Sequence, residues 1–355
     1  MLQLLPACAD WLAGGRPFAV ATIIAARGST PRPVGTAMAV DGAGEVRGSL
    51  SGGCIEAEVY ECCREVLDTG VPLRRRFGYS DAEAFAVGLT CGGELEVHVQ
   101  RLQGPDPQLL ALARTGTGAL VWDLAAPRPR PVAAAGEDPH VSALAEAGQS
   151  GLVRGCARSE LFVAASLPAP RLLVFGANDF AAALLRQAAL LGYGTTLCDA
   201  RPVFATPARF PEAGRVVVDW PDRYLRAEQD AGRLDGRTAV CVLTHDARFD
   251  LPLLELALGL PLAYVGAMGS RRTHEERAAA LRRRGVPGAA LARLHSPIGL
   301  DLGGATPAEV ALSVLAEIVA ARNGRTAVLP LGRVSGPLHG PAPAPPPDRA
   351  GPRPS

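Results

Sequence analysis

The chain has 355 residues, which is enough for two domains that each bury a core of their own. Hydrophobic residues make up 48% and charged residues 20% of it, as in a soluble globular protein. The formal net charge of +1 gives no electrostatic reason to expect nucleic acid or an anionic membrane as a partner. Apart from histidine every basic side chain is arginine, which excludes a Schiff-base lysine, a phosphate-loop lysine and a lysine general base.

The cysteines and the first residues indicate the compartment. Eight cysteines are scattered along the chain without any C-x-x-C pair. The first five residues have no basic start and are followed by Pro6, which makes a poor signal peptide. No apolar run reaches membrane-spanning length. We therefore expect a reduced, cytoplasmic setting with no membrane partner.

The N-terminal part of the chain has the pattern of an α/β domain. Residues 18–25 are apolar and strand-like, and residues 37–48 have the pattern of a hairpin. Between residues 55 and 66 the apolar side chains fall on one face of a predicted helix. Residues 94–100 alternate between apolar and polar, which predicts a further strand.

Two loops in this part place a cysteine beside paired glycines, Ser51-Gly52-Gly53-Cys54 and Cys91-Gly92-Gly93. Because glycine has no Cβ, backbone N–H groups in such loops can approach a ligand closely. The first loop leads into a helix, where free N–H groups and the helix dipole both favour an anion. A thiol beside it adds a soft group that can bind a transition metal or carry sulfur. The alternative is that the glycines make tight turns and the cysteines are small buried residues.

From residue 171 onward short buried strands alternate with helices, which predicts a doubly wound parallel sheet of the Rossmann type. The predicted strands are 172–175, 195–199, 216–218, 239–243 and 262–265. A last helix is predicted to begin at Thr306-Pro307-Ala308-Glu309, which combines an N-cap, a proline at the first helical position and a capping-box glutamate.

The composition changes again beyond Pro330, where Pro-Ala repeats cannot bury enough apolar surface to fold. We therefore expect three parts: an N-terminal α/β domain over residues 1–168, a Rossmann-like domain over 169–326, and a disordered Pro-rich tail over 327–355.

The first turn of the predicted Rossmann domain carries a modified dinucleotide fingerprint. Gly176 ends the first strand, but Asn178 stands where a glycine would let pyrophosphate approach the backbone, and Asp179 adds negative charge. Asp199 ends the second strand, at the position where an acid holds a ribose hydroxyl. This pattern leaves NAD(P) binding open, beside a Rossmann fold with an altered ligand or with none.

Two later loops carry further candidate residues. Thr244-His245-Asp246 follows the fourth strand, so it is expected to flank the same crevice as Gly176. Its alternative role is to cap the helix that follows. Gly269-Ser270-Arg271 opens another helix and presents a guanidinium group that suits phosphate or carboxylate.

Taken together, these motifs resemble a known family. Gly28-Ser29-Thr30-Pro31-Arg32, Gly35, the run from Gly48 to Glu56, and Cys91-Gly92-Gly93 resemble the N-terminal domain of the XdhC/CoxI family. The loops at Thr244 and Gly269, with Ser296-Pro297-Ile298-Gly299 and Thr306-Pro307, are similar to its C-terminal Rossmann domain. The resemblance spans about residues 10–324 and departs at Asn178-Asp179, where relatives commonly have Gly-His.

The resemblance implies an accessory protein for xanthine dehydrogenase or a related molybdenum hydroxylase. Such proteins bind molybdenum cofactor (molybdopterin), assist its sulfuration with a cysteine desulfurase, and deliver it to the apo-enzyme. It implies a maturation factor more than an enzyme, acting as a homo-oligomer. One rival is an NAD(P)-dependent oxidoreductase that uses the Rossmann domain. The other is an interaction module that binds no small molecule.

The resemblance and the loop analysis together define the candidate cofactor-binding residues. They are Ser29, Arg32, Gly35, Ser51, Gly52, Gly53, Cys54, Glu56, Cys91, Gly92, Gly93, Gly176, Asn178, Asp199, Thr244, His245, Asp246, Gly269, Ser270 and Arg271. Cys54 is the first candidate for a thiol that faces molybdenum, because a helix N-terminus favours the thiolate. Cys91 is the second candidate, and Arg32 is the best candidate for pairing with the phosphate.

Overall fold

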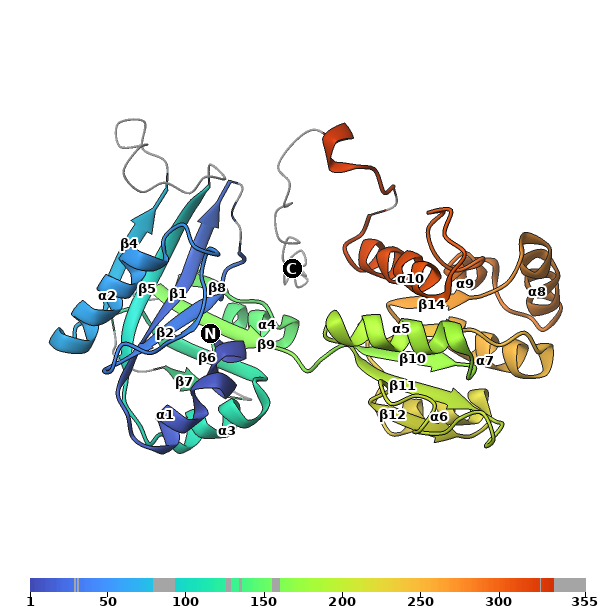
Figure 1. The fold of residues 1–355 in the computed structure, drawn as a ribbon, viewed down its shortest axis with the longest axis horizontal. Helices are drawn as coiled ribbons and strands as arrows, with labels where there is room; N and C mark the ends of the chain where they lie inside the picture. Colours follow the sequence, from blue (N-terminus) through green and yellow to red (C-terminus); the bar gives the residue numbers. More distant parts are fainter. Residues whose placement is uncertain are drawn as a thin grey trace, which may run out of the picture. The chain divides into compact units, whose positions relative to one another are not determined.

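The computed structural model describes residues 1–28, 30, 32–78, 93–125, 129–133, 136–154, 160–325 and 327–334. The chain divides into two compact units, Met1–Pro168 and Ala169–Pro330, each with its own sheets (Figure 1). The predicted tail beyond residue 334 lies outside the described residues, as do Ser29, Cys91 and Gly92. Among the helices of the described part, none is long and apolar enough to cross a membrane.

The first unit contains two antiparallel sheets. The five-stranded sheet has the order β3-β2-β1-β5-β4 and the four-stranded sheet has the order β7-β6-β9-β8. The strands are β1 Phe18–Arg27, β2 Ala37–Asp41, β3 Val46–Gly48, β4 Leu73–Phe77, β5 Glu94–Leu102, β6 Gly118–Asp123, β7 Arg130–Pro131, β8 Gly151–Arg154 and β9 Glu160–Ser166. The helices are η1 Leu2–Cys8, α1 Ala9–Ala13, α2 Glu56–Thr69, α3 Pro107–Thr115 and α4 Pro139–Ala147. The predicted hairpin is β2 and β3, and the predicted amphipathic helix is α2.

These elements stack in layers around three cores. α2 covers one face of the five-stranded sheet, where Val59 and Cys63 meet Ala21 and Ile23. The opposite face packs on the four-stranded sheet and on η1, α1 and α3. α4 covers the outer face of the four-stranded sheet. Because both faces of β1 are covered, its first seven residues are all buried, and it reads as a continuous apolar run.

The second unit is a doubly wound parallel sheet, as predicted, and it has a sixth strand, Leu294–His295, beyond the five expected. Its order is β12-β11-β10-β13-β14-β15, so the chain reverses its direction of progress between β10 and β13. The strands are β10 Arg171–Phe175, β11 Gly194–Asp199, β12 Arg215–Val218, β13 Ala239–Val242, β14 Tyr264–Ala267 and β15 Leu294–His295. The helices are α5 Asp179–Leu190, α6 Pro221–Asp230, α7 Ala247–Gly259, α8 Arg271–Arg283, α9 Gly288–Leu291 and α10 Pro307–Arg322. The short 3-10 helix η2 Leu331–Arg333 comes after the end of this unit in the chain.

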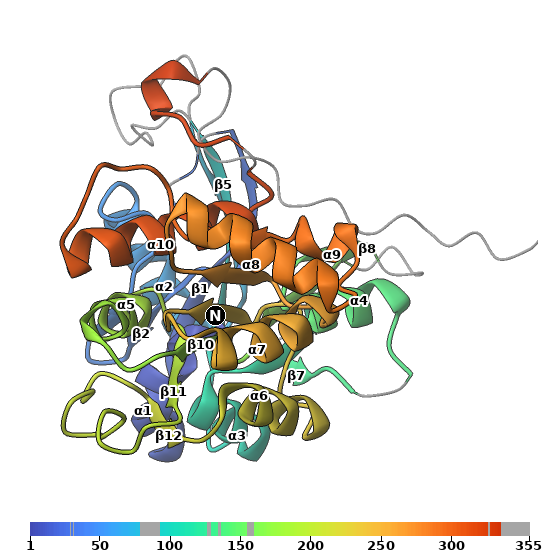
Figure 2. The same ribbon diagram turned by 90° about the vertical axis from the view of Figure 1, so that its right-hand side faces the viewer.

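The helices cover both faces of this sheet. α5 and α10 pack on one face, and α6, α7 and α8 pack on the other (Figure 2). α10 begins with the predicted capping box, since the Thr306 hydroxyl accepts from the Glu309 N–H and the Glu309 carboxylate accepts from the Thr306 N–H. The doubly wound arrangement brings the carboxyl ends of all six strands to one edge, where ligands bind in such folds.

Candidate functional site

The loop of residues 49–55 joins β3 to α2 and closes around a carboxylate of the protein itself. Glu56 is the first residue of α2, and its side chain turns back into the loop. The donors to it are the N–H groups of Leu50, Ser51, Gly52, Gly53 and Ile55 and the hydroxyls of Ser49 and Ser51. The shortest of the N–H contacts are 2.7 Å from Ser51 and 2.8 Å from Gly52 and Gly53.

This arrangement differs from the expectation of an open phosphate cradle. The N–H groups that were expected to hold an anion already hold the Glu56 carboxylate. Burial acts to raise the pKa of Glu56, but the hydrogen bonds from Ser51, Ser49 and Gly52 outweigh it and hold that pKa well below its ordinary value. The carboxylate therefore stays charged at any physiological pH and competes with an external anion for the same donors.

The two glycines of this loop are required by its backbone. Gly52 has φ +84° and Gly53 has φ +126°, in the left-handed region that other residues rarely adopt. A Cβ at either position would meet nothing within 4 Å, so space is not the constraint. The pair of glycines lets successive N–H groups turn toward one acceptor, which here is Glu56.

Cys54 differs from the other cysteines that the structure describes. It is half-buried beside the core under α2, whereas the other described cysteines are buried. Its N–H donates to the Ser51 hydroxyl at 3.0 Å. Cys63 lies within α2, and burial raises the pKa of its thiol to about 12, which leaves it protonated and inert. Cys54 is thus the accessible thiol of this loop.

The strand register shows at which end of the five-stranded sheet the N-terminal loops lie. Arg27 of β1 pairs with Glu94 of β5, so Gly28 and Gly93 lie opposite each other where these strands meet the connecting loops. Gly48, at the end of β3, pairs with Met38, which pairs with Ala21 of β1. β1 continues for six residues beyond Ala21, roughly 20 Å at the rise of a strand. The loop that carries Cys54 therefore leaves the sheet toward the same end as Gly28 and Gly93. It leaves level with Ala21, six residues before β1 ends.

Arg32 and Gly35 lie in the connection between β1 and β2. Arg32 is exposed, and no described residue forms an ion pair or hydrogen bond with it. Gly35 has φ +91°, and a Cβ there would lie 2.5 Å from the Ser150 Oγ. Gly35 is thus explained by its close packing against Ser150, and Arg32 is the residue of this connection that is open to an anion.

At the switch point of the Rossmann sheet, the loops after β10 and β13 touch. A Cβ on Gly176 would lie 2.8 Å from the Thr244 Cγ2, so this glycine lets the two loops approach. The Asn178 amide donates to the Leu243 carbonyl at 2.9 Å and accepts from the Ala181 N–H at 3.0 Å. Asn178 is therefore the N-cap of α5, and it takes up one of the N–H groups that a pyrophosphate would need.

Asp199 is also engaged within the protein. One of its oxygens accepts from the Ala177 N–H at 2.7 Å and from the Arg201 guanidinium at 2.8 Å. The other accepts from the Arg201 N–H and from its Nε, both at 2.9 Å. Burial acts to raise the pKa of Asp199, but Arg201 and the backbone donors outweigh it and lower that pKa. No lone pair is left for a ribose hydroxyl while Arg201 stays in place.

The three residues of the Thr244-His245-Asp246 motif have different roles. His245 is exposed. Asp246 is the N-cap of α7 and pairs with Arg248, whose hydrogen bond lowers the pKa of Asp246 to about 2. This is the capping alternative considered for the motif. Thr244 is buried, and its hydroxyl donates to Asp250 on α7.

Asp250 belongs to a buried ion pair that sequence reasoning missed. Arg277 of α8 donates to Asp250 at 3.1 Å and to the Met268 carbonyl at 3.0 Å, and its other nitrogen donates to the Ser296 hydroxyl at 3.2 Å. Burial raises the pKa of Asp250, and the Thr244 hydroxyl and Arg277 act against this. The pair thus ties together the loops that follow β13, β14 and β15.

The loop after β14 leads into α8. Ser270 is the N-cap and accepts from the Thr273 N–H at 3.1 Å, and Gly269 has φ +153°. Arg271 is exposed and has no ion pair among the described residues, whereas its neighbour Arg272 pairs with Glu276. Arg271 is therefore the guanidinium of this loop that is open to an anion.

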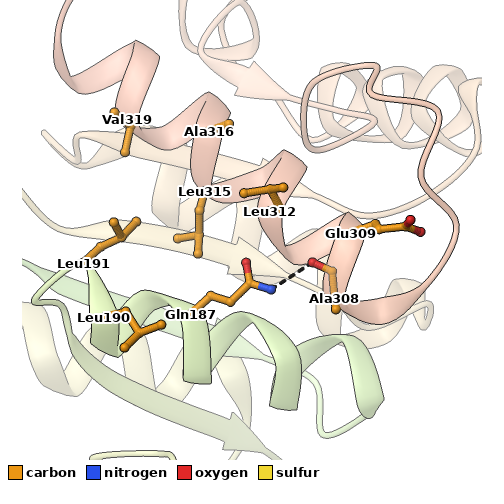
Figure 3. Close-up of a pocket in the computed structure, with 9 residues that line it drawn as sticks. All are labelled: Gln187, Leu190, Leu191, Ala308, Glu309, Leu312, Leu315, Ala316 and Val319. Atoms are coloured by element: carbon orange, nitrogen blue, oxygen red, sulfur yellow. Dashed lines mark hydrogen bonds between the residues drawn. The ribbon is translucent and has the colours of Figure 1, made fainter.

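A groove between α5 and α10 was not predicted from the sequence. It has a volume of about 640 Å³ and an apolar lining, and the Gln187 amide crosses it to donate to the Ala308 carbonyl at 2.9 Å (Figure 3). Leu190 on its rim is 85% exposed and Leu312 is 56% exposed. None of the predicted site residues lines it. One sequence feature could have predicted the groove: α10 is apolar around most of its circumference, and Leu312 lies outside the face of α10 that is buried.

Metal ligands do not gather anywhere in the part of the chain that the structure describes, since no group of three His, Cys, Asp or Glu side chains could hold an ion.

The comparisons with known proteins agree with the motifs. Residues 11–78 match the XdhC and CoxI family, and residues 172–318 match the XdhC Rossmann domain. The chain belongs to the XdhC/CoxI family. The resemblance inferred from the N-terminal loops and from the Thr244 and Gly269 loops is thereby confirmed. Asn178-Asp179, the departure noted in the sequence, lies within the matched Rossmann domain.

Two relatives of this XdhC/CoxI-family protein align along most of its length. One, from Bacillus subtilis (strain 168), is named as a probable subunit of xanthine dehydrogenase; it is 26% identical over 87% of this chain and 94% of its own. The other, from Escherichia coli (strain K12), is named molybdenum cofactor insertion chaperone PaoD; it is 27% identical over 88% of this chain and 85% of its own. A crystal structure of a xanthine dehydrogenase from Bacillus halodurans shares the fold, with a TM-score of 0.68 over 91% of this chain and 96% of that one at 24% identity.

Proposed function

We propose that this XdhC/CoxI-family protein binds molybdenum cofactor and inserts it into the apo-form of a xanthine dehydrogenase-like molybdenum hydroxylase. The observation that carries the proposal is its similarity, over 88% of the chain, to a protein named as a molybdenum cofactor insertion chaperone. We further propose that it supports sulfuration of the cofactor together with a cysteine desulfurase, and that it acts as a cytoplasmic homo-oligomer. In this role it is a maturation factor and not an enzyme.

Cys54 is the residue that we assign to the metal end of the cargo. Its sulfur is a soft ligand, and among the described thiols it is the one that is partly exposed. The absence of a three-ligand cluster among the described residues suits a cargo that must be released again. A single protein thiol would hold the metal centre more weakly than a dedicated site does.

The phosphate of the cofactor needs a different partner from the one that the glycine motif suggested. The N–H groups of loop 49–55 do not fit a phosphate while Glu56 occupies them. Arg32 fits better, because it is exposed and no described residue pairs with it. Val34, two residues further on, packs against the same core as Cys54. We therefore propose that Arg32 pairs with the phosphate.

The rival function, an NAD(P)-dependent oxidoreductase, has less support. All four acceptor positions of Asp199 are occupied by Ala177 and Arg201, and Asn178 caps α5 where a pyrophosphate would bind. We expect the Rossmann unit to serve contacts with a partner protein or with a ligand other than an ordinary dinucleotide.

Retention of the cofactor by purified variants tests the proposal. The protein is incubated with molybdenum cofactor released from a molybdenum hydroxylase and is then desalted, and the retained molybdenum and pterin are measured. We expect the wild type to retain both and Cys54→Ala to lose most of the retained molybdenum. Cys62→Ala is the matched control, because Cys62 is a buried thiol two turns along the same segment. Equal retention by both variants would remove Cys54 from the site, and no retention by the wild type would refute the function.

A further inference from the structure

We propose that Glu56 is a positioning residue, which fixes loop 49–55 and thereby holds Cys54 in place, and that it does not itself contact the cargo. The physical part of this inference, that Glu56 sets the accessibility of Cys54, stands on the geometry of the loop. Its consequence for cofactor transfer rests on the proposed function.

The backbone on both sides of Cys54 is tied to this one carboxylate. The Gly53 N–H donates to the Glu56 Oε2 at 2.8 Å, and the Ile55 N–H donates to it at 3.2 Å. The N–H of Cys54 itself donates to the Ser51 hydroxyl at 3.0 Å, and that hydroxyl donates to Glu56. Each of the three successive N–H groups around the thiol therefore reaches Glu56 directly or through Ser51.

The glycine pair lies between buried residues, Leu50 and Ser51 on one side and Ile55 on the other, but makes no packing contacts of its own. Gly52 and Gly53 are exposed, and a Cβ on either would touch nothing within 4 Å. Both have left-handed φ angles, which a flexible glycine pair leaves readily when its hydrogen bonds are lost. Charge-assisted hydrogen bonds to a carboxylate are the strong kind, so Glu56 is the main polar anchor of the glycine pair between the buried Leu50 and Ile55.

The charge and not only the shape of Glu56 is needed. Both oxygens of Glu56 accept hydrogen bonds. The donors at Oε1 are the Ser49 hydroxyl and the N–H groups of Leu50, Ser51 and Gly52, and those at Oε2 are the Ser51 hydroxyl and the N–H groups of Gly53 and Ile55. A glutamine has one acceptor oxygen, and its NH₂ group would face N–H donors at the other position. Glu56→Gln therefore keeps the volume of the side chain and removes about half of the loop's anchor.

The same contacts define what the loop can offer a ligand. With its N–H groups satisfied by Glu56, the loop disfavours external anions, and its thiol, Cys54, stays partly exposed. Glu56 thus separates two functions that the glycine–cysteine motif could serve, since it closes the anion cradle and orders the thiol.

Amide exchange and thiol labelling of the full chain test the positioning role. The variants are Glu56→Gln and, as a matched control, Glu61→Gln, which changes an exposed glutamate on the same helix. We expect amide exchange in residues 51–55 to become roughly tenfold or more faster in Glu56→Gln, the effect of losing hydrogen bonds to a charged group. We also expect iodoacetamide to label Cys54 several-fold faster. Buried Cys62 and Cys63 should stay protected in both variants, which reports that α2 is still folded.

A second variant keeps the test decisive if Glu56→Gln does not fold. Ser51→Ala removes the hydroxyl that links the Cys54 N–H to Glu56 and leaves the carboxylate in place. Faster exchange of the Cys54 amide in this variant supports the same role. Unchanged exchange and unchanged or slower labelling of Cys54 in a folded Glu56→Gln or Ser51→Ala protein would overturn it.

Cofactor retention separates this inference from the proposed function. If the loop loosens in Glu56→Gln and retained molybdenum falls as in Cys54→Ala, both stand. If the loop loosens and retention is unchanged, the positioning role stands and the assignment of Cys54 to the cargo fails. Addition of inorganic phosphate should not slow amide exchange in the wild-type loop; slower exchange would show that the cradle is open and would overturn the inference.

Discussion

Removing the cation of the buried ion pair in the Rossmann unit should destabilise the protein strongly. Arg277→Met deletes a guanidinium that donates to Asp250, to the Met268 carbonyl and to the Ser296 hydroxyl at 3.0–3.2 Å. The side chains of both charged partners are 4% exposed, so water cannot replace the lost contacts. Asp250 would remain as a buried carboxylate that accepts a hydrogen bond from the Thr244 hydroxyl but has lost its ion pair. Removal of one partner from such a pair costs about 3–5 kcal/mol.

This loss of unfolding free energy can be measured as a fall in the melting temperature, Tm. For a domain of this size 1 kcal/mol shifts Tm by about 2–4 °C, so we expect Arg277→Met to melt about 6–20 °C lower than the wild type. Arg272→Met is the control on the same helix, because its ion pair with Glu276 has side chains that are 88% and 65% exposed. Loss of that exposed pair should cost less than about 1 kcal/mol. Calorimetric melting of both variants makes the comparison.

The pH dependence gives an independent check of the cause. Burial already raises the pKa of Asp250, and without Arg277 the main cation that opposes this effect is gone, so the pKa rises further. A carboxyl whose folded pKa lies above its unfolded value of about 3.9 costs least stability at low pH and most above its folded pKa. The Tm difference between Arg277→Met and wild type should therefore shrink as the pH falls toward about 4. A shift as small as that of Arg272→Met, or one independent of pH, would refute the reasoning.

Two further predictions concern the nucleotide crevice and the end of the chain. Calorimetry should find that the wild type binds NAD more weakly than micromolar, and that Asn178→Gly with Asp179→His binds it more tightly, since the double change removes the cap of α5 and a carboxylate beside the pyrophosphate position; micromolar binding by the wild type with no gain in the variant would contradict this. Truncation after residue 330 should leave Tm and cofactor retention unchanged, because the Pro-rich composition leaves little apolar surface to dock. A clear fall in either quantity would show that the tail docks.

Much of the fold was determined by local sequence alone. The alternation of buried strands with helices after residue 171 requires a parallel sheet, since each crossover returns the chain to the same edge. The start of α10 at Thr306 followed from a capping box whose two partners are three residues apart. The hairpin of β2 and β3 and the amphipathic face of α2 likewise depend on neighbours along the chain. The predicted bounds of one strand were two residues too early: residues 262–265 were expected, and β14 spans Tyr264–Ala267.

Which acceptor the loop donors of the candidate site hold could not be predicted from the sequence, although Glu56 and Arg201 each lie within seven residues of their partners. A glycine loop at a helix start predicts a ring of N–H donors, but the same pattern suits an external phosphate or the protein's own Glu56 carboxylate. Asp199 has the sequence position of a ribose ligand, and only the folded chain places Arg201 on both of its oxygens. Sequence periodicity predicts which face of a helix or strand is apolar, but it does not predict which polar groups form hydrogen bonds with each other.

Contacts between distant segments were decided only by the tertiary structure. Asp250 and Arg277 meet because α7 and α8 pack on the same face of the sheet. Gln187 and Ala308 meet across the groove because α5 and α10 share the other face. Because β3 ends level with Ala21 of β1, the Cys54 loop leaves the sheet several residues before the loops of Gly28 and Gly93 do. Such pairings depend on strand order and register, which arise from the packing of the whole unit. Caps, turns and the alternation of apolar residues in strands depend instead on residues that are neighbours in the chain.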